Sequence, residues 1–389
     1  MILHFFLKFS LMILVIPALI APSFGGNRSG LLQNNMYKRI NGIQHIGVGV
    51  PNHSESWKWY RKFLGMDIAL FNGEAEAPLM KIYTKNKVIN KRAAMILNLH
   101  GGCAMEVVSP VSFKATHAST PFELGDLGIF ITQVKANDVK SAFKWFKENG
   151  ADMNGDVYQL PYGGDTFFVR DLNGLHFQVI GASDWYLTPK HATGGTVGCT
   201  IGVSNIEKAM TLYADILGYD KVVLDQTGVF DDWKNTMPGG GKKFRRVLLT
   251  QSAAPGGGFA KVMGSTFIEL AQAMDYTPKK IYADRMWGDI GFVHLGFDVR
   301  GMTAIGEDLA KAGFGFTCDT KNTLDMGGTT RVHCTYIEDP DGTLIEMIEV
   351  YKIPILEKFG IFLNVEKRDP LKPLPDYLLK ALRFSRIND

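Results

Sequence analysis

Apolar and polar residues alternate along residues 43–50, with the period of two that is typical of a β-strand. Residues 52–64 follow with apolar side chains at helical spacing, Trp57, Tyr60 and Leu64. The same strand and helix return at residues 197–213, and the two segments align without a gap. A Leu-Gly pair follows each helix, and glycine suits a helix C-terminus because it adopts positive φ readily. The pattern predicts a repeated unit that starts with a strand and a helix.

Two looser copies of the unit begin at residues 128 and 292. Each continues from its strand into a helical segment and then into strands that are broken by a turn, Asp-Leu-Asn-Gly at 171–174 and Asp-Pro-Asp-Gly at 339–342. An alternating strand follows each turn. We therefore predict four units, each with one strand, one helix and about three further strands, which together make an α+β fold.

The chain of 389 residues is longer than one ordinary hydrophobic core supports. We expect two domains that follow the sequence, residues 39–183 with units one and two, and residues 194–352 with units three and four. Residues 353–389 are predicted to form a C-terminal tail, with one amphipathic helix near residues 374–384.

The composition favours a small molecule as the partner of this chain. Hydrophobic residues make up 46% and charged residues 21%, as in ordinary soluble globular proteins. The net charge of +3 comes without a long basic run, so nothing marks a surface for nucleic acid. The four cysteines have no C-x-x-C spacing, so neither a zinc knuckle nor a disulfide scaffold is indicated, and we interpret them as small buried hydrophobic residues.

The first residues have the features of a targeting segment. Lys8 precedes an apolar stretch, residues 9–20, and small residues follow it up to Gly26. The stretch is short for a membrane span, so we expect a signal peptide at residues 1–26 and export to the periplasm or the exterior. The competing prediction is an uncleaved N-terminal membrane anchor, because no clear A-x-A cleavage site is present.

Three motifs carry a resemblance to a known family. The first strand has His-Ile-Gly-Val at residues 45–48, Tyr followed by Leu-Gly precedes the second strand, and Asp-Pro-Asp-Gly followed by Glu lies near the end. In this order they resemble the vicinal-oxygen-chelate (VOC) superfamily of glyoxalases, bleomycin-resistance proteins and extradiol dioxygenases. The resemblance covers nearly all of residues 43–350. It implies four βαβββ modules whose pairs form curled mixed sheets around a metal, with ligands from the first and last strands of each module.

The ligand positions that the resemblance implies can be compared between modules. In the first strands they hold, in chain order, His45, Ile129, Gly198 and His294. In the last strands they hold Glu106, Gln178, Glu269 and Glu346. A divalent metal generally needs three or four protein ligands. Only modules one and four together offer a complete set, which is His45, Glu106, His294 and Glu346. Modules two and three are predicted to form a vestigial site with Glu269 alone. The resemblance to fused glyoxalase I chains and to hydroquinone dioxygenases implies the same pairing of the outer modules.

Two imidazoles and two carboxylates suit one divalent ion, Zn, Ni, Co, Mn or Fe, with two open positions for a substrate that carries two adjacent oxygens. An unpaired carboxylate buried in an apolar strand costs several kcal/mol, so a metal is the simplest partner for both glutamates. The resemblance implies a lyase or isomerase similar to glyoxalase I, which stabilises an enediolate. We expect Glu346 to act as the base, with Glu106 opposite it across the metal.

Two other functions stay open. His45, His294 and Glu346 alone would hold Fe(II) for a ring-cleaving extradiol or hydroquinone dioxygenase. The third hypothesis is a non-catalytic protein that binds a small molecule in the same cup, because one scaffold hosts several functions. Contact between Glu106 and the metal favours the isomerase, whereas a Glu106 that is turned away favours the oxygenase.

Overall fold

The structure is a computed structural model that describes residues 38–387 except 322–323, 326–330, 357–360 and 367. The predicted signal peptide, residues 1–26, lies outside the described residues. Within the described ranges, none of the helices is both long enough and apolar enough to cross a membrane.

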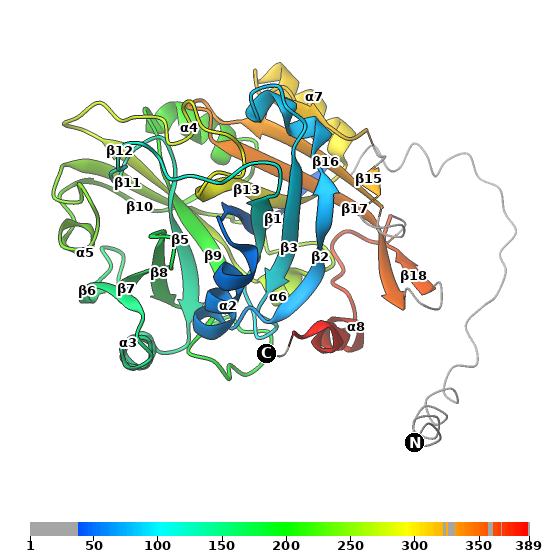
Figure 1. The fold of residues 1–389 in the computed structure, drawn as a ribbon, viewed down its shortest axis with the longest axis horizontal. Coiled ribbons are helices and arrows are strands. Elements are labelled where there is room, and N and C mark those ends of the chain that lie inside the picture. The colour runs from blue at the N-terminus through cyan, green and yellow to red at the C-terminus, as the bar shows by residue number, and fades with distance from the viewer. Residues whose placement is uncertain (1–37, 322–323, 326–330, 357–360, 367, 388–389) are drawn as a thin grey trace, which may run out of the picture.

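The order of strand, helix and three strands recurs four times along the chain, with one additional two-residue strand in the last unit (Figure 1). The first unit contains β1 (Arg39–Gly49), α2 (His53–Leu64), β2 (Ile68–Glu76), β3 (Asn90–Leu97) and β4 (Ala104–Pro110). The second contains β5 (Gly128–Ala136), α3 (Val139–Glu148), β6 (Asp152–Gln159), β7 (Asp165–Arg170) and β8 (His176–Gly181). The third contains β9 (Thr193–Gly202), α4 (Ile206–Tyr213), β10 (Lys221–Gly228), β11 (Phe244–Thr250) and β12 (Phe267–Ala273). The fourth contains β13 (Gly291–Arg300), α7 (Met302–Lys311), β14 (Cys318–Asp319), β15 (Leu324–Asp325), β16 (Arg331–Glu338) and β17 (Leu344–Leu356).

Short helices interrupt the units, namely η2 (Pro78–Tyr83), α5 (Asp231–Lys234) and α6 (Ala260–Met263). After the fourth unit come β18 (Ile361–Asn364), α8 (Asp376–Ala381) and η4 (Leu382–Ser385). The last two lie where the sequence predicts the tail helix. β17 runs past residue 352, and β18 pairs with it through Ile353 and Leu363, so the sheet extends into the segment that we predicted to be a tail.

The strands form two curled mixed sheets, and this confirms the predicted fold class. The first sheet has ten strands, with the order β14-β16-β17-β13-β1-β4-β3-β2, while β15 and β18 pair at its side. The second has eight, with the order β10-β11-β12-β9-β5-β8-β7-β6. The first unit therefore shares a sheet with the fourth, and the second with the third. Each sheet takes one unit from residues 39–183 and one from residues 194–352, so the sheets divide the chain differently from the predicted domains.

Two equivalent hydrogen bonds join consecutive units across this arrangement. Tyr60 of α2 donates its hydroxyl to Asp171 in the turn of unit two, at 2.8 Å. Tyr213 of α4 does the same to Asp339 in the turn of unit four, at 2.9 Å. The helix of an odd-numbered unit is thus tied to the last turn of the unit that follows it. Units that are neighbours in sequence are thus linked through a helix and a turn. Pairing through strands joins the two outer units to each other and the two inner units to each other.

One hydrophobic core lies between the sheets, and alternation along the strands selects the residues that enter it. Ile46 and Leu295 from the first sheet and Val134 and Cys199 from the second are all fully buried in the same cluster. The neighbours of these residues along each strand point to the opposite face of the sheet. We call this opposite, curled face of each sheet its cup.

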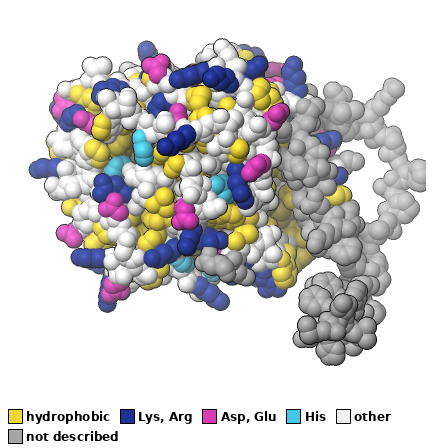
Figure 2. Space-filling model, viewed as in Figure 1, with side chains coloured by type: hydrophobic (Ala, Val, Ile, Leu, Met, Phe, Trp, Pro, Cys, Tyr) yellow, Lys and Arg dark blue, Asp and Glu magenta, His cyan; other side chains and the backbone are white. Residues whose placement is uncertain are grey.

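The surface and the cysteines agree with ordinary globular packing. Figure 2 shows Lys and Arg side chains spread over the visible face, with Asp and Glu side chains between them. The cysteines are buried and none of them forms a disulfide, as the sequence predicts; they are Cys103, Cys199, Cys318 and Cys334.

Candidate metal centre

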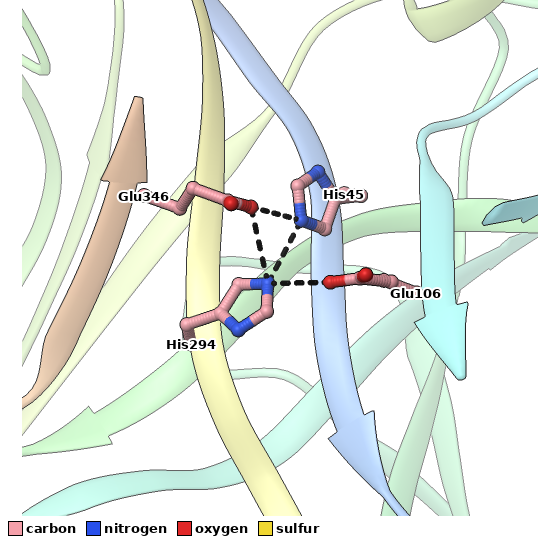
Figure 3. Close-up of side chains that lie close together, drawn as sticks. All are labelled: His45, Glu106, His294 and Glu346. Carbon is pink, nitrogen blue, oxygen red and sulfur yellow. Dashed lines mark hydrogen bonds and ion pairs between the residues drawn. The ribbon is translucent and has the colours of Figure 1, made fainter. Parts of the chain in front are cut away.

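Four side chains from adjacent strands meet in the cup of the first sheet (Figure 3). They are His45 from β1, Glu106 from β4, His294 from β13 and Glu346 from β17. The strand order β17-β13-β1-β4 sets them side by side. Each offers one ligand atom, and these four atoms all lie within 4.8 Å of one another. The structure therefore brings together all four residues that the sequence singles out.

The four ligand atoms converge on one point. Nε2 of His45 lies 2.9 Å from Nε2 of His294 and 3.0 Å from Oε2 of Glu346. Nε2 of His294 lies 3.3 Å from Oε2 of Glu346 and 3.3 Å from Oε2 of Glu106. The histidine side chains are fully buried, and the glutamate side chains are 7–8% exposed. Two imidazole nitrogens and two carboxylate oxygens in this arrangement fit the donor set of a divalent ion.

Two glycines make room for the histidine rings. A Cβ atom at Gly47 would lie 2.2 Å from Cε1 of His294, and one at Gly296 would lie 2.1 Å from Cε1 of His45. β1 and β13 are antiparallel, and their register pairs His45 with Gly296 and Gly47 with His294. Each ring therefore lies over the glycine of the opposite strand. The motif His-x-Gly occurs in both strands, and this signal in the sequence supports the equivalence of the two histidines.

Burial and charge act in opposite directions on the pKa values of this cluster. Burial raises the pKa of Glu346, but His294 and His45 hold it well below its usual value. Burial also raises the pKa of Glu106, while Lys91 and His294 bring it down to about 2. Burial lowers the pKa of His294, and the two carboxylates raise it to about 9. The positive charges that face the two buried carboxylates in this structure are those of Lys91 and of the His294 imidazolium.

Each glutamate turns one oxygen toward the cluster and the other toward a donor outside it. Lys91, at the start of β3, lies 3.2 Å from Oε1 of Glu106. The thiol of Cys334 in β16 donates to Oε1 of Glu346 at 2.8 Å. Donors of this kind orient metal ligands and tune their affinity. We did not identify either residue from the sequence, because a lysine at a strand end and an isolated buried cysteine are both common without such a role.

Aromatic rings line the cluster on the side of His294. The ring of Trp287 stacks parallel to that of His294, with centroids 6.4 Å apart, and Tyr336 meets it edge-on at 5.7 Å. Nζ of Lys91 lies 4.8 Å from the centroid of Trp287. Trp287 and Tyr336 belong to a hydrophobic cluster that lines the cup of the first sheet. The polar site is therefore set in apolar surroundings, which strengthens its electrostatic interactions.

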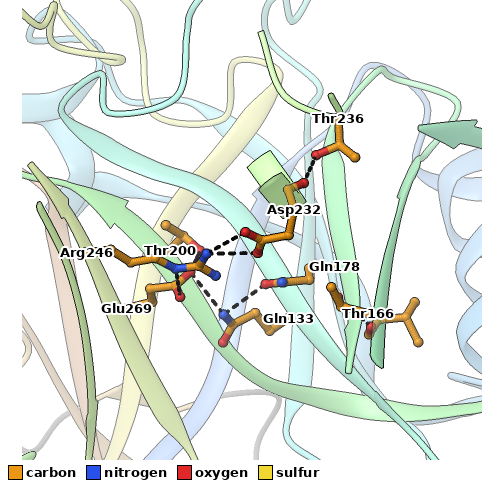
Figure 4. Close-up of polar contacts among 9 residues, drawn as sticks. Gln133, Thr166, Gln178, Thr200, Asp232, Thr236, Arg246 and Glu269 are labelled. Carbon is orange, nitrogen blue, oxygen red and sulfur yellow. Dashed lines mark hydrogen bonds and ion pairs between the residues drawn. The ribbon is translucent and has the colours of Figure 1, made fainter. Parts of the chain in front are cut away.

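The second sheet holds a cation of its own at the corresponding place (Figure 4). The guanidinium of Arg246 in β11 donates through Nε to Glu269 at 2.7 Å and through Nη1 to Asp232 at 2.8–2.9 Å. Thr200 donates to the other oxygen of Glu269 at 2.6 Å. Gln178, at the last-strand ligand position of the second unit, instead accepts from Gln133 at 3.1 Å. The sequence leaves the partner of Glu269 open, and the structure identifies it as an arginine.

Comparisons with known proteins support the fold. No protein-family model and no curated protein matches the chain. Among solved structures, glyoxalase I from Zea mays matches with a TM-score of 0.51 and 16% identity, over 80% of this chain and 92% of the maize chain. A putative dioxygenase from Bacillus subtilis matches with a TM-score of 0.53 and 14% identity, over 90% of this chain and 98% of that chain.

At these identities, a structural match shows the fold and does not assign the reaction. The chain therefore shares its fold with a glyoxalase I and a putative dioxygenase, which agrees with the fold that the motifs in its sequence predict.

Proposed function

We propose that this chain is an enzyme that binds one divalent metal ion through His45, Glu106, His294 and Glu346. The observation that carries the proposal is the convergence of these four ligand atoms, within 4.8 Å of one another, in a buried cup. The substrate is a small molecule with two adjacent oxygens, and the reaction is a proton transfer of the kind that glyoxalase I performs as a lyase or isomerase. The identity of the metal among Zn, Ni, Co, Mn and Fe is left to experiment.

A bound divalent ion would supply Lewis-acid stabilisation of the negative charge that develops on the two substrate oxygens of an enediolate. The two histidines and two glutamates would hold this ion. The residues around them exclude water, because the cup is lined by Trp287 and Tyr336 and the four ligands are buried. A dry site makes each charge interaction stronger than it would be in water.

The two glutamates have different partners, and this supports Glu346 as the base. Glu106 accepts from the ammonium group of Lys91, which favours the charged form and makes this carboxylate a weak proton acceptor. Glu346 accepts from the thiol of Cys334, which is a weaker, neutral donor. When the two histidines bind a metal they are neutral and no longer hold Glu346 in its charged form, whereas Lys91 still does so for Glu106. Glu346 would then take the proton from the substrate carbon, while Glu106 stays charged.

The dioxygenase alternative uses His45, His294 and Glu346 without Glu106. In the structure, Oε2 of Glu106 is directed at Nε2 of His294, 3.3 Å away. This orientation supports four ligands over three, and so supports proton transfer over oxygen chemistry. The non-catalytic alternative requires no proton transfer at all. One experiment separates the three.

The test is exchange of carbon-bound hydrogen for deuterium in D2O, followed by proton NMR on hydroxyacetone and dihydroxyacetone. Metal-loaded wild-type protein should catalyse the exchange, and Glu346→Gln should reduce it by about 100-fold or more. Glu269→Gln, at the equivalent position of the second sheet, serves as the matched control and should exchange at the wild-type rate. Uptake of O2 with hydroquinones by iron-loaded protein, without exchange, would replace the proposal with the dioxygenase. Tight binding of these ligands without either activity would support the hypothesis of a non-catalytic binding protein.

Export is a separate proposal that rests on the sequence of residues 1–26 alone. Mass spectrometry of the mature protein from its native cell tests it. A chain that begins near residue 27 in the exported fraction would support a cleaved signal peptide. An intact N-terminus in the membrane fraction would support the anchor instead.

A further inference from the structure

Lys91 is a basic side chain at the metal cluster that does not serve as a ligand. It extends from the start of β3, and its Nζ lies 3.2 Å from Oε1 of Glu106. The other oxygen of the same carboxylate, Oε2, faces the cluster. Its side chain is 20% exposed, whereas the ligand side chains are 0–8% exposed. Lys91 is therefore more exposed to solvent than the four ligand side chains that it adjoins.

The ammonium group of Lys91 has unused hydrogen-bonding capacity. It can donate three hydrogen bonds, and one goes to Glu106. It also lies over the ring of Trp287, with 4.8 Å between Nζ and the centroid. The ammonium group makes no other hydrogen bond with the described residues. A ligand atom beside the cluster could accept from it.

The sum of the charges in the cup suggests what Lys91 binds. The charges of a divalent ion and of the two glutamates cancel, and the histidines are neutral when they bind metal. The ammonium group then leaves one net positive charge in the cup. Within the described residues, Glu106 is the one carboxylate that forms an ion pair with this ammonium group. A partly buried ammonium group whose one carboxylate partner also serves the cluster favours an anionic ligand.

The walls of the cup indicate what the rest of the ligand is. Ala93 and Val108 face the cup from β3 and β4, and Trp287 and Tyr336 close the side next to His294. These side chains offer apolar and aromatic contacts and few hydrogen-bonding groups. A ligand that fits this environment has one charged, chelating end and an apolar or aromatic remainder.

We propose that Lys91 selects a substrate that carries one negative charge at its chelating end, such as a carboxylate beside a hydroxyl or carbonyl oxygen, on an apolar or aromatic body. This inference rests on the proposed metal-dependent function and specifies its substrate class. Lys91 donates to the anionic group while the adjacent oxygens lie toward the cluster. It is a residue that determines specificity, and it does not transfer the proton.

The test compares two ligands of equal shape that differ in charge, 3-phenyllactate and its neutral amide, 3-phenyllactamide. Binding of each to metal-loaded protein is measured by isothermal titration calorimetry, with the metal content of every sample measured beside it. The variant Lys91→Gln removes the charge but keeps an N–H donor for Glu106. The variant Lys91→Arg keeps the charge. Arg92→Met is the matched control, because Arg92 is the next residue of β3, is exposed and points to the other face of the sheet.

Wild-type protein should prefer the carboxylate over the amide. Lys91→Gln should lower this preference by about tenfold to a hundredfold at unchanged metal content, since a hydrogen bond to a charged group contributes that much. Lys91→Arg and Arg92→Met should keep the preference within about threefold of wild type, a change of less than 1 kcal/mol.

Three results would overturn the inference. An equal loss of affinity for both ligands in Lys91→Gln would mean that Lys91 only supports Glu106. A preference that survives Lys91→Gln intact would mean that the metal alone selects the charge. Either of these two results for Lys91→Gln would leave the proposed metal-dependent function in place. Wild-type protein without metal after metal-replete expression would end the inference and the proposed function together, because the positive charge in the cup requires the ion.

Discussion

Replacing Arg246 by Met tests whether the second cup is held together by an internal cation. The Arg246 side chain is fully buried, and so is that of Glu269, while Asp232 is 1% exposed. Methionine keeps much of the contact with the ring of Trp233, over which the guanidinium carbon lies at 3.8 Å. What it removes is the positive charge between two buried carboxylates. Breaking a buried ion pair by removing one partner costs about 3–5 kcal/mol, and two acids lose their partner here.

The expected result is a fall of about 3–5 kcal/mol in the free energy of unfolding at pH 7. Urea titration followed by circular dichroism measures it. The matched control is the triple variant Arg246→Met, Asp232→Asn, Glu269→Gln, which makes the whole network neutral. It should regain most of the loss, because replacing a complete buried charge network by neutral groups is often close to neutral in stability.

The loss should also depend on pH in a defined direction. Burial raises the pKa of Asp232 in the wild-type protein against the opposing effect of Arg246. Without Arg246 this pKa should rise further above that of the unfolded chain. A group with a raised folded pKa is protonated as the pH falls, so the penalty present at pH 7 should shrink toward pH 5. A loss below about 1 kcal/mol at pH 7, or a triple variant as unstable as the single one, would refute the reasoning.

Four further predictions concern the first cup and the helices. Glu106 and Glu346 raise the pKa of His294 to about 9, so metal binding at pH 7 should release a proton from this ring. Calorimetry in buffers of different ionisation enthalpy should detect the released proton. The same raised pKa stabilises the metal-free protein below about pH 6.5, and this stabilisation should be lost as the pH rises through about 9, as thermal unfolding at several pH values would reveal. Cys334→Val should weaken metal binding by about 10- to 100-fold, whereas Cys334→Ser, which keeps a donor to Glu346, should stay near wild type in a competition assay with a chelator. Tyr60→Phe and Tyr213→Phe should each lower the unfolding free energy by about 1–3 kcal/mol, because each removes a hydroxyl that donates to a buried aspartate.

The repeat in the sequence and the resemblance to the VOC superfamily together predicted the fold and the cluster. His45 and His294 occupy equivalent places in two first strands, and the same holds for Glu106 and Glu346 in two last strands. Comparing the modules therefore needs no knowledge of tertiary structure. The pairing of the outer modules followed from the same comparison, since only they carry a complete set. The predicted domain boundaries follow the order of the sequence, whereas the sheets join modules that are far apart in it, as the pairing of β1 with β13 shows.

The residues around both sites could not be predicted in this way. Arg246 lies in the third strand of its module, and Asp232 in the short helix α5, so neither is at a position that the repeat defines as a ligand. Lys91 contacts Glu106 only because β3 pairs with β4 in the register that sets Lys91 opposite Pro110 and Met95 opposite Glu106. Such contacts depend on side-chain direction and on long-range pairing, which a hydrophobic pattern does not specify.

The central claim is that the first and last modules build one metal site, and the metal-to-protein ratio of purified protein measures it most directly. Inductively coupled plasma mass spectrometry after metal-replete expression should find one divalent ion per chain in the wild type and in Glu269→Gln. His294→Ala should hold almost none, because it loses a ligand at the centre of the cluster. Wild-type protein without metal, or His294→Ala with a full complement, would contradict the claim.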